Sequence, residues 1–157
     1  MRFCFILLIL FAVALPSYAA TSLPLPRFVS VKSTEANVRN GPGLHYPIKW
    51  VIQRQGLPVE VVAEFEQWRK VRDVQNDEGW VHRSQLSGKR TVLITGKTQT
   101  VREDNDPSSP PVARMEAGVV ADLLDCSDTA CEVEADKQKG WIDRAYLWGI
   151  YPPKGQE

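Results

Sequence analysis

The sequence repeats one series of short motifs in its two halves. Residues 37–43 read NVRNGPG, and a glycine, a valine-rich run and the motif GWVHRSQL at 79–86 follow. Residues 100–104 read TVRED, and a glycine, a second valine-rich run and the motif GWIDRAYL at 140–147 follow. The two Gly-Trp pairs lie 61 residues apart. This period is longer than that of solenoid repeats and predicts two small domains in tandem, an arrangement typical of binding proteins.

The first residues of the chain have the pattern of an export signal. Arg2 is the only charged residue in this stretch, and thirteen apolar residues, 3–15, follow it. Small residues at Ser17 and Ala19 mark a signal peptidase site, so we expect residues 1–19 to be removed. Thirteen apolar residues are fewer than the roughly 20 that span a bilayer. We therefore expect a periplasmic or secreted protein with no membrane span in the mature chain.

The two halves of the mature chain differ in charge. Residues 20–89 contain 10 basic and 7 acidic residues, whereas residues 90–157 contain 8 basic and 12 acidic residues. No run of basic residues marks a nucleic-acid site, and we expect no nucleic-acid partner. The positive first half favours an anionic surface such as a cell-wall polymer, or alternatively the two halves attract each other. Salt screening makes either effect mild.

Two cysteines remain after the signal is removed, Cys126 and Cys131. Both histidines, His45 and His82, lie in the other half, so no further metal ligand is evident and we expect neither a metal site nor a cofactor. Because export leads to an oxidising compartment, we predict a Cys126–Cys131 disulfide. It closes a short loop, for which chain entropy gives a stabilisation of about 2 kcal/mol.

Glycine and proline interrupt the chain at short intervals, and the runs between them are rich in β-branched residues. No window after the signal has a sustained helical period. Short strands at this spacing predict an all-β fold of small sandwiches or barrels. We expect strands at 48–53, 57–65, 68–74, 80–82, 91–95, 99–102, 112–115, 119–124, 131–135 and 141–143.

The tryptophans are the largest apolar residues available to two domains of this size. A domain of about 60 residues buries little surface, so we expect Trp80 and Trp141 to contribute to its core, together with Trp68. The second half has Ala130 where the first has Trp68. We interpret the predicted disulfide as partial compensation for that missing ring.

These motifs together identify a family. NVRNGPG, the Trp-x-Lys-Val at 68–71 and the Gly-Trp-Val-His-x-Ser-x-Leu motif resemble the bacterial SH3-like (SH3b) domain. The first copy spans about 30–88. The second, about 91–149, is divergent, because EDNDP at 103–107 replaces the Asn-Gly-Pro-Gly turn. The ending LWGIYP, which leads into a tail at 150–157, is similar to a subgroup of small exported tandem SH3-like proteins.

The resemblance implies two tandem small, partly open β-barrels. Members of the family commonly act as targeting or binding modules for peptidoglycan or peptide ligands, often fused to cell-wall hydrolases. The two modules use up the mature sequence and leave no room for a hydrolase. We therefore expect a non-catalytic exported binding protein whose partner is peptidoglycan or an envelope protein or peptide.

The resemblance also places a ligand groove beside the loop that follows the first motif. Tyr46 and Trp50 supply aromatic surface suited to sugar faces or proline-rich peptides. Arg39 and Arg54 lie nearby in sequence and can meet a carboxylate. We predict that Arg39, Tyr46, Trp50 and Arg54 contact the ligand. Two alternatives stay open: Trp50 packs in the core or against the second module, and Arg39 braces the loop.

We expect no enzymatic activity. Cysteine catalysis needs a free thiolate beside a histidine, whereas Cys126 and Cys131 are expected to be bonded to each other. The main alternative function is a structural or regulatory scaffold for a cell-envelope enzyme, acting through the C-terminal tail. Trp148 and Tyr151 in that tail either seal one barrel onto the other or form a docking motif.

Overall fold

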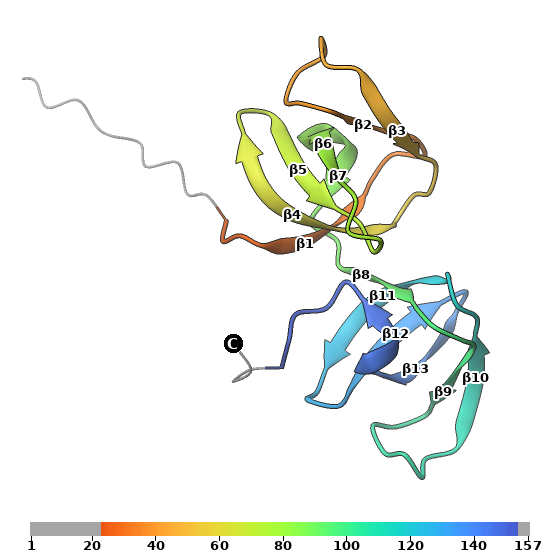
Figure 1. Cartoon of the computed structure of the whole chain (residues 1–157). Helices are drawn as coiled ribbons and strands as arrows, with labels where there is room; N and C mark the ends of the chain where they lie inside the picture. Colours follow the sequence, from red (N-terminus) through yellow and green to blue (C-terminus); the bar gives the residue numbers. More distant parts are fainter. Residues whose placement is uncertain (1–22, 154–157) are drawn as a thin grey trace, which may run out of the picture.

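The computed structural model describes residues 23–153, and the expected signal peptide lies outside this range. Each half of the described chain forms one seven-stranded antiparallel sheet that curls around a core of its own (Figure 1). The only helices among these residues are two 3₁₀ turns. The prediction of an all-β fold with two small SH3-like modules is confirmed, and neither sheet closes fully into a barrel.

The first module has the strand order β3-β2-β6-β5-β4-β1-β7. Its elements are β1 (Arg27–Val31), β2 (Ala36–Arg39), β3 (Ile48–Ile52), β4 (Pro58–Phe65), β5 (Trp68–Arg72), β6 (Glu78–His82), η1 (Arg83–Gln85) and β7 (Leu86–Ser87).

The second module repeats this topology in the order β10-β9-β13-β12-β11-β8-β14. Its elements are β8 (Thr91–Ile94), β9 (Gln99–Arg102), β10 (Pro111–Met115), β11 (Val120–Cys126), β12 (Ala130–Ala135), β13 (Gln138–Asp143), η2 (Arg144–Tyr146) and β14 (Leu147–Trp148).

The repeated Gly-Trp pair marks the place where two strands cross closely in each module. A Cβ atom on Gly79 would lie 2.3 Å from Cγ1 of Val38, and one on Gly140 would lie 2.4 Å from the carbonyl oxygen of Arg102. Only a residue without a side chain fits there. The repeat in the sequence therefore reflects the approach of β6 to β2 and of β13 to β9.

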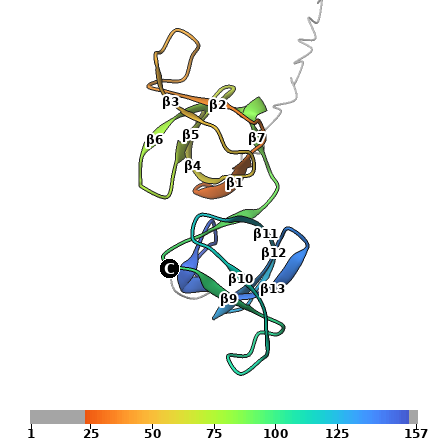
Figure 2. The same ribbon diagram turned by 90° about the vertical axis from the view of Figure 1, so that its right-hand side faces the viewer.

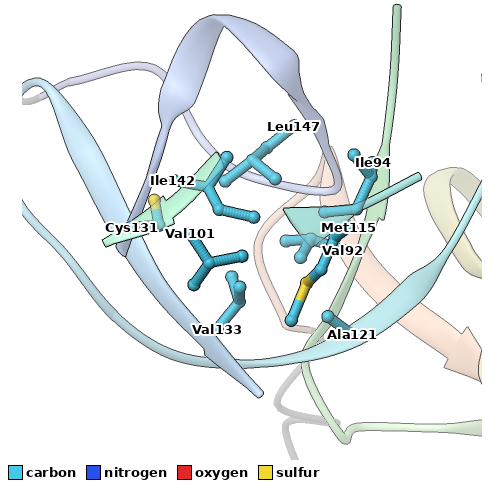
Figure 3. Close-up of a cluster of buried hydrophobic side chains, with 9 residues drawn as sticks. All are labelled: Val92, Ile94, Val101, Met115, Ala121, Cys131, Val133, Ile142 and Leu147. Carbon is cyan, nitrogen blue, oxygen red and sulfur yellow. The ribbon is translucent and has the colours of Figure 1, made fainter. Parts of the chain in front are cut away.

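Each core is built mainly from small aliphatic side chains. The buried cluster of the first module consists of Val31, Ala36, Val38, Ile52, Val59, Val61, Val71 and Val81. That of the second consists of Val92, Ile94, Val101, Met115, Ala121, Cys131, Val133, Ile142 and Leu147 (Figure 3).

Of the three tryptophans expected in these cores, only Trp68 is buried. Val81 and Ile142 point into the core, and side chains alternate along a strand, so the preceding Trp80 and Trp141 face outward. Trp68 is buried, with 8% of its surface exposed, yet it is not part of the core cluster. The expectation of a buried ring is therefore confirmed for Trp68 and wrong for Trp80 and Trp141, because closely spaced valines and isoleucine occupy the inward-facing positions of β6 and β13.

The predicted disulfide is present. Cys126 and Cys131 are directly opposite each other on β11 and β12, and their sulfur atoms are bonded. Cys131 is fully buried in the second core, whereas Cys126 is exposed at the end of the hairpin. The bond therefore ties the exposed end of the hairpin to the core.

The C-terminal segment joins the two modules, which lie one above the other in both views (Figures 1 and 2). The backbone N–H of Phe28 donates to the hydroxyl of Tyr151 over 3.1 Å, and the ring of Trp148 stands edge-on to that of Phe28 at 5.2 Å. The Arg90 guanidinium lies 4.5 Å from the centre of the Tyr151 ring. In this structure the tail therefore seals one module onto the other.

Candidate binding site

The same outward-facing surface exists on both modules. In the first it is formed by β2, β6 and β5 with the loop 40–47, and Arg39 lies opposite Trp80. In the second it is formed by β9, β13 and β12 with the loop 103–110, and Arg102 lies opposite Trp141. Sheet register thus places one arginine–tryptophan pair at the centre of each surface.

In the first module the arginine holds the loop in place. Nη1 of Arg39 donates hydrogen bonds to the carbonyl oxygens of Leu44, at 3.2 Å, and Tyr46, at 2.7 Å. The rings of His45 and Tyr46 stack with their centres 4.2 Å apart, and Tyr46 remains 37% exposed. Arg39 therefore braces the loop, which presents a positioned aromatic pair to solvent.

The other predicted ligand residues of this module lie in different surroundings. Trp50 is half-buried and packs against the core, while Nζ of Lys49 lies 5.0 Å from the centre of its ring. Arg54 is exposed and lines a hollow together with Val120 and Asp122 of the second module. The structure thus brings Arg39 and Tyr46 into contact, places Trp50 on the adjacent strand and sets Arg54 at the module boundary.

Trp68 covers the neighbouring part of the first surface. Its ring lies edge-on to His82 at 5.3 Å, with an angle of 83° between the two planes. His82 and Trp68 are cross-strand partners on β6 and β5. Nδ1 of His82 is also 2.7 Å from the hydroxyl of Ser84, so the histidine is held between the tryptophan and the turn.

In the second module the corresponding position is open. Ala130 lies opposite Asp143, as Trp68 lies opposite His82. A hollow of about 480 Å³ extends over Ala130 and is bordered by Trp141, Asp143, Arg102 and the loop residues 104–107. We refer to it as the Ala130 hollow. The sequence contains the signal for it, the alanine in place of a tryptophan, but we interpreted that change only as a loss of core volume.

Hydrogen bonds order the loop beside this hollow. Nη1 of Arg102 donates to the carbonyl oxygen of Ser109 over 2.7 Å, which repeats the role of Arg39. The Asp106 carboxylate accepts bonds from the backbone N–H and the hydroxyl of Ser108, both at 2.8 Å. These bonds, and secondarily the positive charge of Arg102, lower the pKa of Asp106. The loop therefore has a defined shape and an ionised carboxylate.

Within residues 23–153, no group of three or more His, Cys, Asp or Glu side chains is placed to hold a metal ion. None of the helices in this part of the chain has the length and apolar character that a membrane crossing requires. Both surfaces place aromatic faces beside fixed charges, a combination suited to sugars, peptides and carboxylates.

The fold and the paired surfaces define a tandem of two small SH3-like modules with partly open sheets. The sequence profile described as the bacterial SH3 domain matches residues 32–88 and again residues 95–149. Because these matches cover more than half of the chain, the protein belongs to the bacterial SH3 domain family. No curated protein matches the sequence.

Solved structures give more distant matches. NlpC2 from Trichomonas vaginalis is 11% identical, with a TM-score of 0.38 over 83% of this chain and 50% of its own. NlpC1 from the same organism is 12% identical, with a TM-score of 0.36 over 82% and 48%. An NlpC/P60 family protein from Bacillus cereus is 15% identical, with a TM-score of 0.34 over 80% and 57%. The chain thus spans about half the length of these proteins, and the low TM-scores transfer none of their properties to it.

Proposed function

We propose that this protein is a non-catalytic binding protein of the cell envelope, periplasmic or secreted, that recognises peptidoglycan. The observation that carries the proposal is the Arg39-braced loop of a bacterial SH3 module, which presents His45 and Tyr46 to solvent. Aromatic rings of this kind suit the apolar faces of sugars and peptide side chains. Because Arg39 fixes the loop before the ligand arrives, less conformational entropy is lost on binding.

The charges around the loop fit an anionic polymer. Lys49 is exposed on β3 shortly after the aromatic pair, and the first half of the mature chain has 10 basic against 7 acidic residues. Carboxylates of the wall peptides would meet these cations, and binding would weaken as salt is added.

The alternative of a scaffold that acts through the tail receives less support. The hydroxyl of Tyr151 accepts a hydrogen bond from Phe28, and Trp148 packs on the ring of the same residue. A partner that docked on these two aromatics would first have to displace them from the first module. The loop aromatics, in contrast, are accessible without any rearrangement.

The test is co-sedimentation of the mature protein, residues 20–157, with purified peptidoglycan. We expect the wild type to sediment and Tyr46→Ala to lower the apparent affinity about tenfold, as removal of an aromatic contact typically does. The matched control is Phe65→Ala, which removes a ring that is 52% exposed at the opposite hairpin, between β4 and β5. Circular dichroism verifies that both variants are folded.

Two results would contradict the proposal. If the wild type does not sediment, peptidoglycan is not the ligand, and the search moves to envelope proteins and peptides. If Tyr46→Ala and Phe65→Ala sediment like the wild type, the wall is bound elsewhere than at the Arg39-braced loop.

A further inference from the structure

We propose that the Ala130 hollow is a second binding site, which takes the carboxyl terminus of a peptide with an apolar last side chain. The last side chain would occupy the space over Ala130, and the terminal carboxylate would pair with the cations at the rim. This site lies on the other module, and the inference does not rest on peptidoglycan being the ligand of the first.

The hollow lies where the same fold places a large side chain in the first module. Trp68 and Ala130 hold the same register position, opposite the residue that closes the sixth strand of each sheet, His82 and Asp143. In the first module the indole ring occupies this position and is only 8% exposed. In the second, the indole of Trp141 remains at the border of a hollow of about 480 Å³. An apolar side chain placed there would replace the contacts that Trp68 makes with its own module.

Two cations at the rim have no partner within the described residues. Neither Nζ of Lys97 nor the guanidinium of Arg114 makes a hydrogen bond or ion pair with any residue in 23–153, although both border the hollow. Asp106 and Asp143, in contrast, already accept hydrogen bonds from their own loops, at 2.8 Å from Ser108 and Ala145 respectively. These hydrogen bonds leave the carboxylates charged, so three cations and three carboxylates border the hollow. Among the described side chains, Lys97 and Arg114 are the two cations that are free to pair with an incoming group. A terminal carboxylate is a small anion that such cations bind through charge-assisted hydrogen bonds.

The adjacent backbone favours a peptide over a free small anion. In the described residues, β9 and β13 are paired at one position, Arg102 opposite Trp141. Thr100 and Asp143, two residues further along, form no ladder pair with each other, and both are exposed at the hollow. Each is paired on its other side, Thr100 with Arg114 on β10 and Asp143 with Ala130 on β12. The two strands therefore separate at the hollow, where an extended chain can lie along them, as peptides lie along sheet edges in other peptide-binding domains.

The experiment titrates the full mature chain with two soluble probes, acetyl-Ala-Ala-Leu as the free acid and the same peptide as the carboxamide. The indole N–H signal of Trp141 in a nitrogen-15 NMR spectrum reports on binding. We expect the acid to shift this signal saturably and the amide to bind at least about tenfold more weakly, because it lacks the charge. The double variant Lys97→Gln/Arg114→Gln should bind the acid no better than wild type binds the amide, whereas Lys137→Gln, an exposed lysine elsewhere in the module, should bind normally.

Ala130→Trp tests the space itself, because it introduces the residue that the first module holds at that position. We expect it to abolish the shift caused by the acid while the protein remains folded. If Ala130→Trp does not fold, Ala130→Leu fills part of the same space and should weaken binding of the acid at least about tenfold.

Three results would each overturn the proposal: equal binding of acid and amide, full binding by both Ala130→Trp and the double variant, or no saturable shift at all. Co-sedimentation of Ala130→Trp with peptidoglycan distinguishes this site from the proposed site on the first module. If peptidoglycan binds to the first module, the variant should sediment like the wild type.

Discussion

A group of charged side chains on the outer face of the first module centres on the carboxylate of Glu78. Nη2 of Arg72 lies 2.8 Å from Oε1 of Glu78, and Lys70 pairs with the second oxygen. The hydrogen bond from Lys70, followed by that from Arg72, lowers the pKa of Glu78. The stabilisation from this carboxylate is therefore present above its unfolded pKa, about 4.3, and is lost as pH falls through the lower folded pKa.

Glu78→Gln should accordingly lower the melting temperature at pH 7 by a few degrees or less, because these groups are partly solvated and exposed ion pairs contribute little. The difference from wild type should narrow as pH falls below about 4. Thermal unfolding of both proteins across this pH range measures the effect. Glu66→Gln, at the exposed end of the same sheet, is the control. A difference that stays constant with pH would show that Glu78 acts through packing alone.

For single residues, the sequence predicted which neighbours face opposite sides of a strand, but not which side is buried. Alternation along a strand implies that Trp80 and Val81 face opposite sides, but it does not state which side is the core. The valines fill a narrow space closely, so the larger tryptophan is the one turned outward. The aligned motifs also showed that the second module has Ala130 where the first has Trp68. That this exchange opens a hollow could be seen only once the outward face was known.

Among the elements, the hairpin of β11 and β12 has a covalent closure that its counterpart in the first module lacks. The bond between Cys126 and Cys131 joins cross-strand partners at the end of the hairpin. Arg144 reaches the same hairpin end, where its Nη1 donates to the carbonyl oxygen of Ser127 over 2.7 Å. The disulfide therefore supports both the hairpin and the residue that follows β13.

Reduction of this bond should destabilise the second module by about 2 kcal/mol, the chain-entropy value for so short a loop. The measurement is urea unfolding of the mature chain with and without dithiothreitol. Cys126→Ser should resemble the reduced wild type and should not respond to the reductant. A wild type whose stability is unchanged by dithiothreitol, with reduction verified by thiol titration, would refute a stabilising role for the bond.

The elements that the sequence did not reveal are short or lie outside the repeated motifs. β7 and β14 contain two residues each and β2 contains four, too few for a clear pattern of alternation, and β1 precedes the first motif. The longer valine-rich strands β4 and β11 were predicted nearly to their ends. Strands were predicted correctly where apolar residues recur between glycines. The short strands were missed because their own residues have no distinctive pattern and only their pairing with another strand defines them.

For the whole molecule, the relative position of the modules depends on contacts that are distant in sequence. Phe28 and Tyr151 are 123 residues apart, and Thr91 donates to the carbonyl oxygen of Gly56 across the module boundary over 2.6 Å. Lys89 and Asp122 form an ion pair between the linker and the second module at 2.8 Å. The sequence indicated a short linker and aromatic residues in the tail, but no local pattern specifies which residue of the first module they meet.

Gly149 permits this arrangement, because it has a backbone φ of +107° at the point where the tail passes β4 and β8. A Cβ atom there would lie 2.7 Å from the carbonyl oxygen of Thr91 and 3.1 Å from Cβ of Pro58, which belongs to the first module. Gly149→Ala should therefore cost about 1–3 kcal/mol, the range for a strained backbone, and should displace Trp148 and Tyr151 from Phe28.

Calorimetry should show that Gly149→Ala weakens the coupling between unfolding of the first module and unfolding of the second. Wild type should unfold in one transition, because the shared contacts make the modules cooperative, whereas Gly149→Ala should unfold in two, with the less stable module first. Gly88→Ala is the matched control, because Gly88 lies in the linker and a Cβ atom there would meet no atom within 4 Å. If both variants unfold like wild type, the tail contacts are too weak to couple the modules. If Gly149→Ala alone splits the transition, the tail is the element that fixes the two binding surfaces relative to each other.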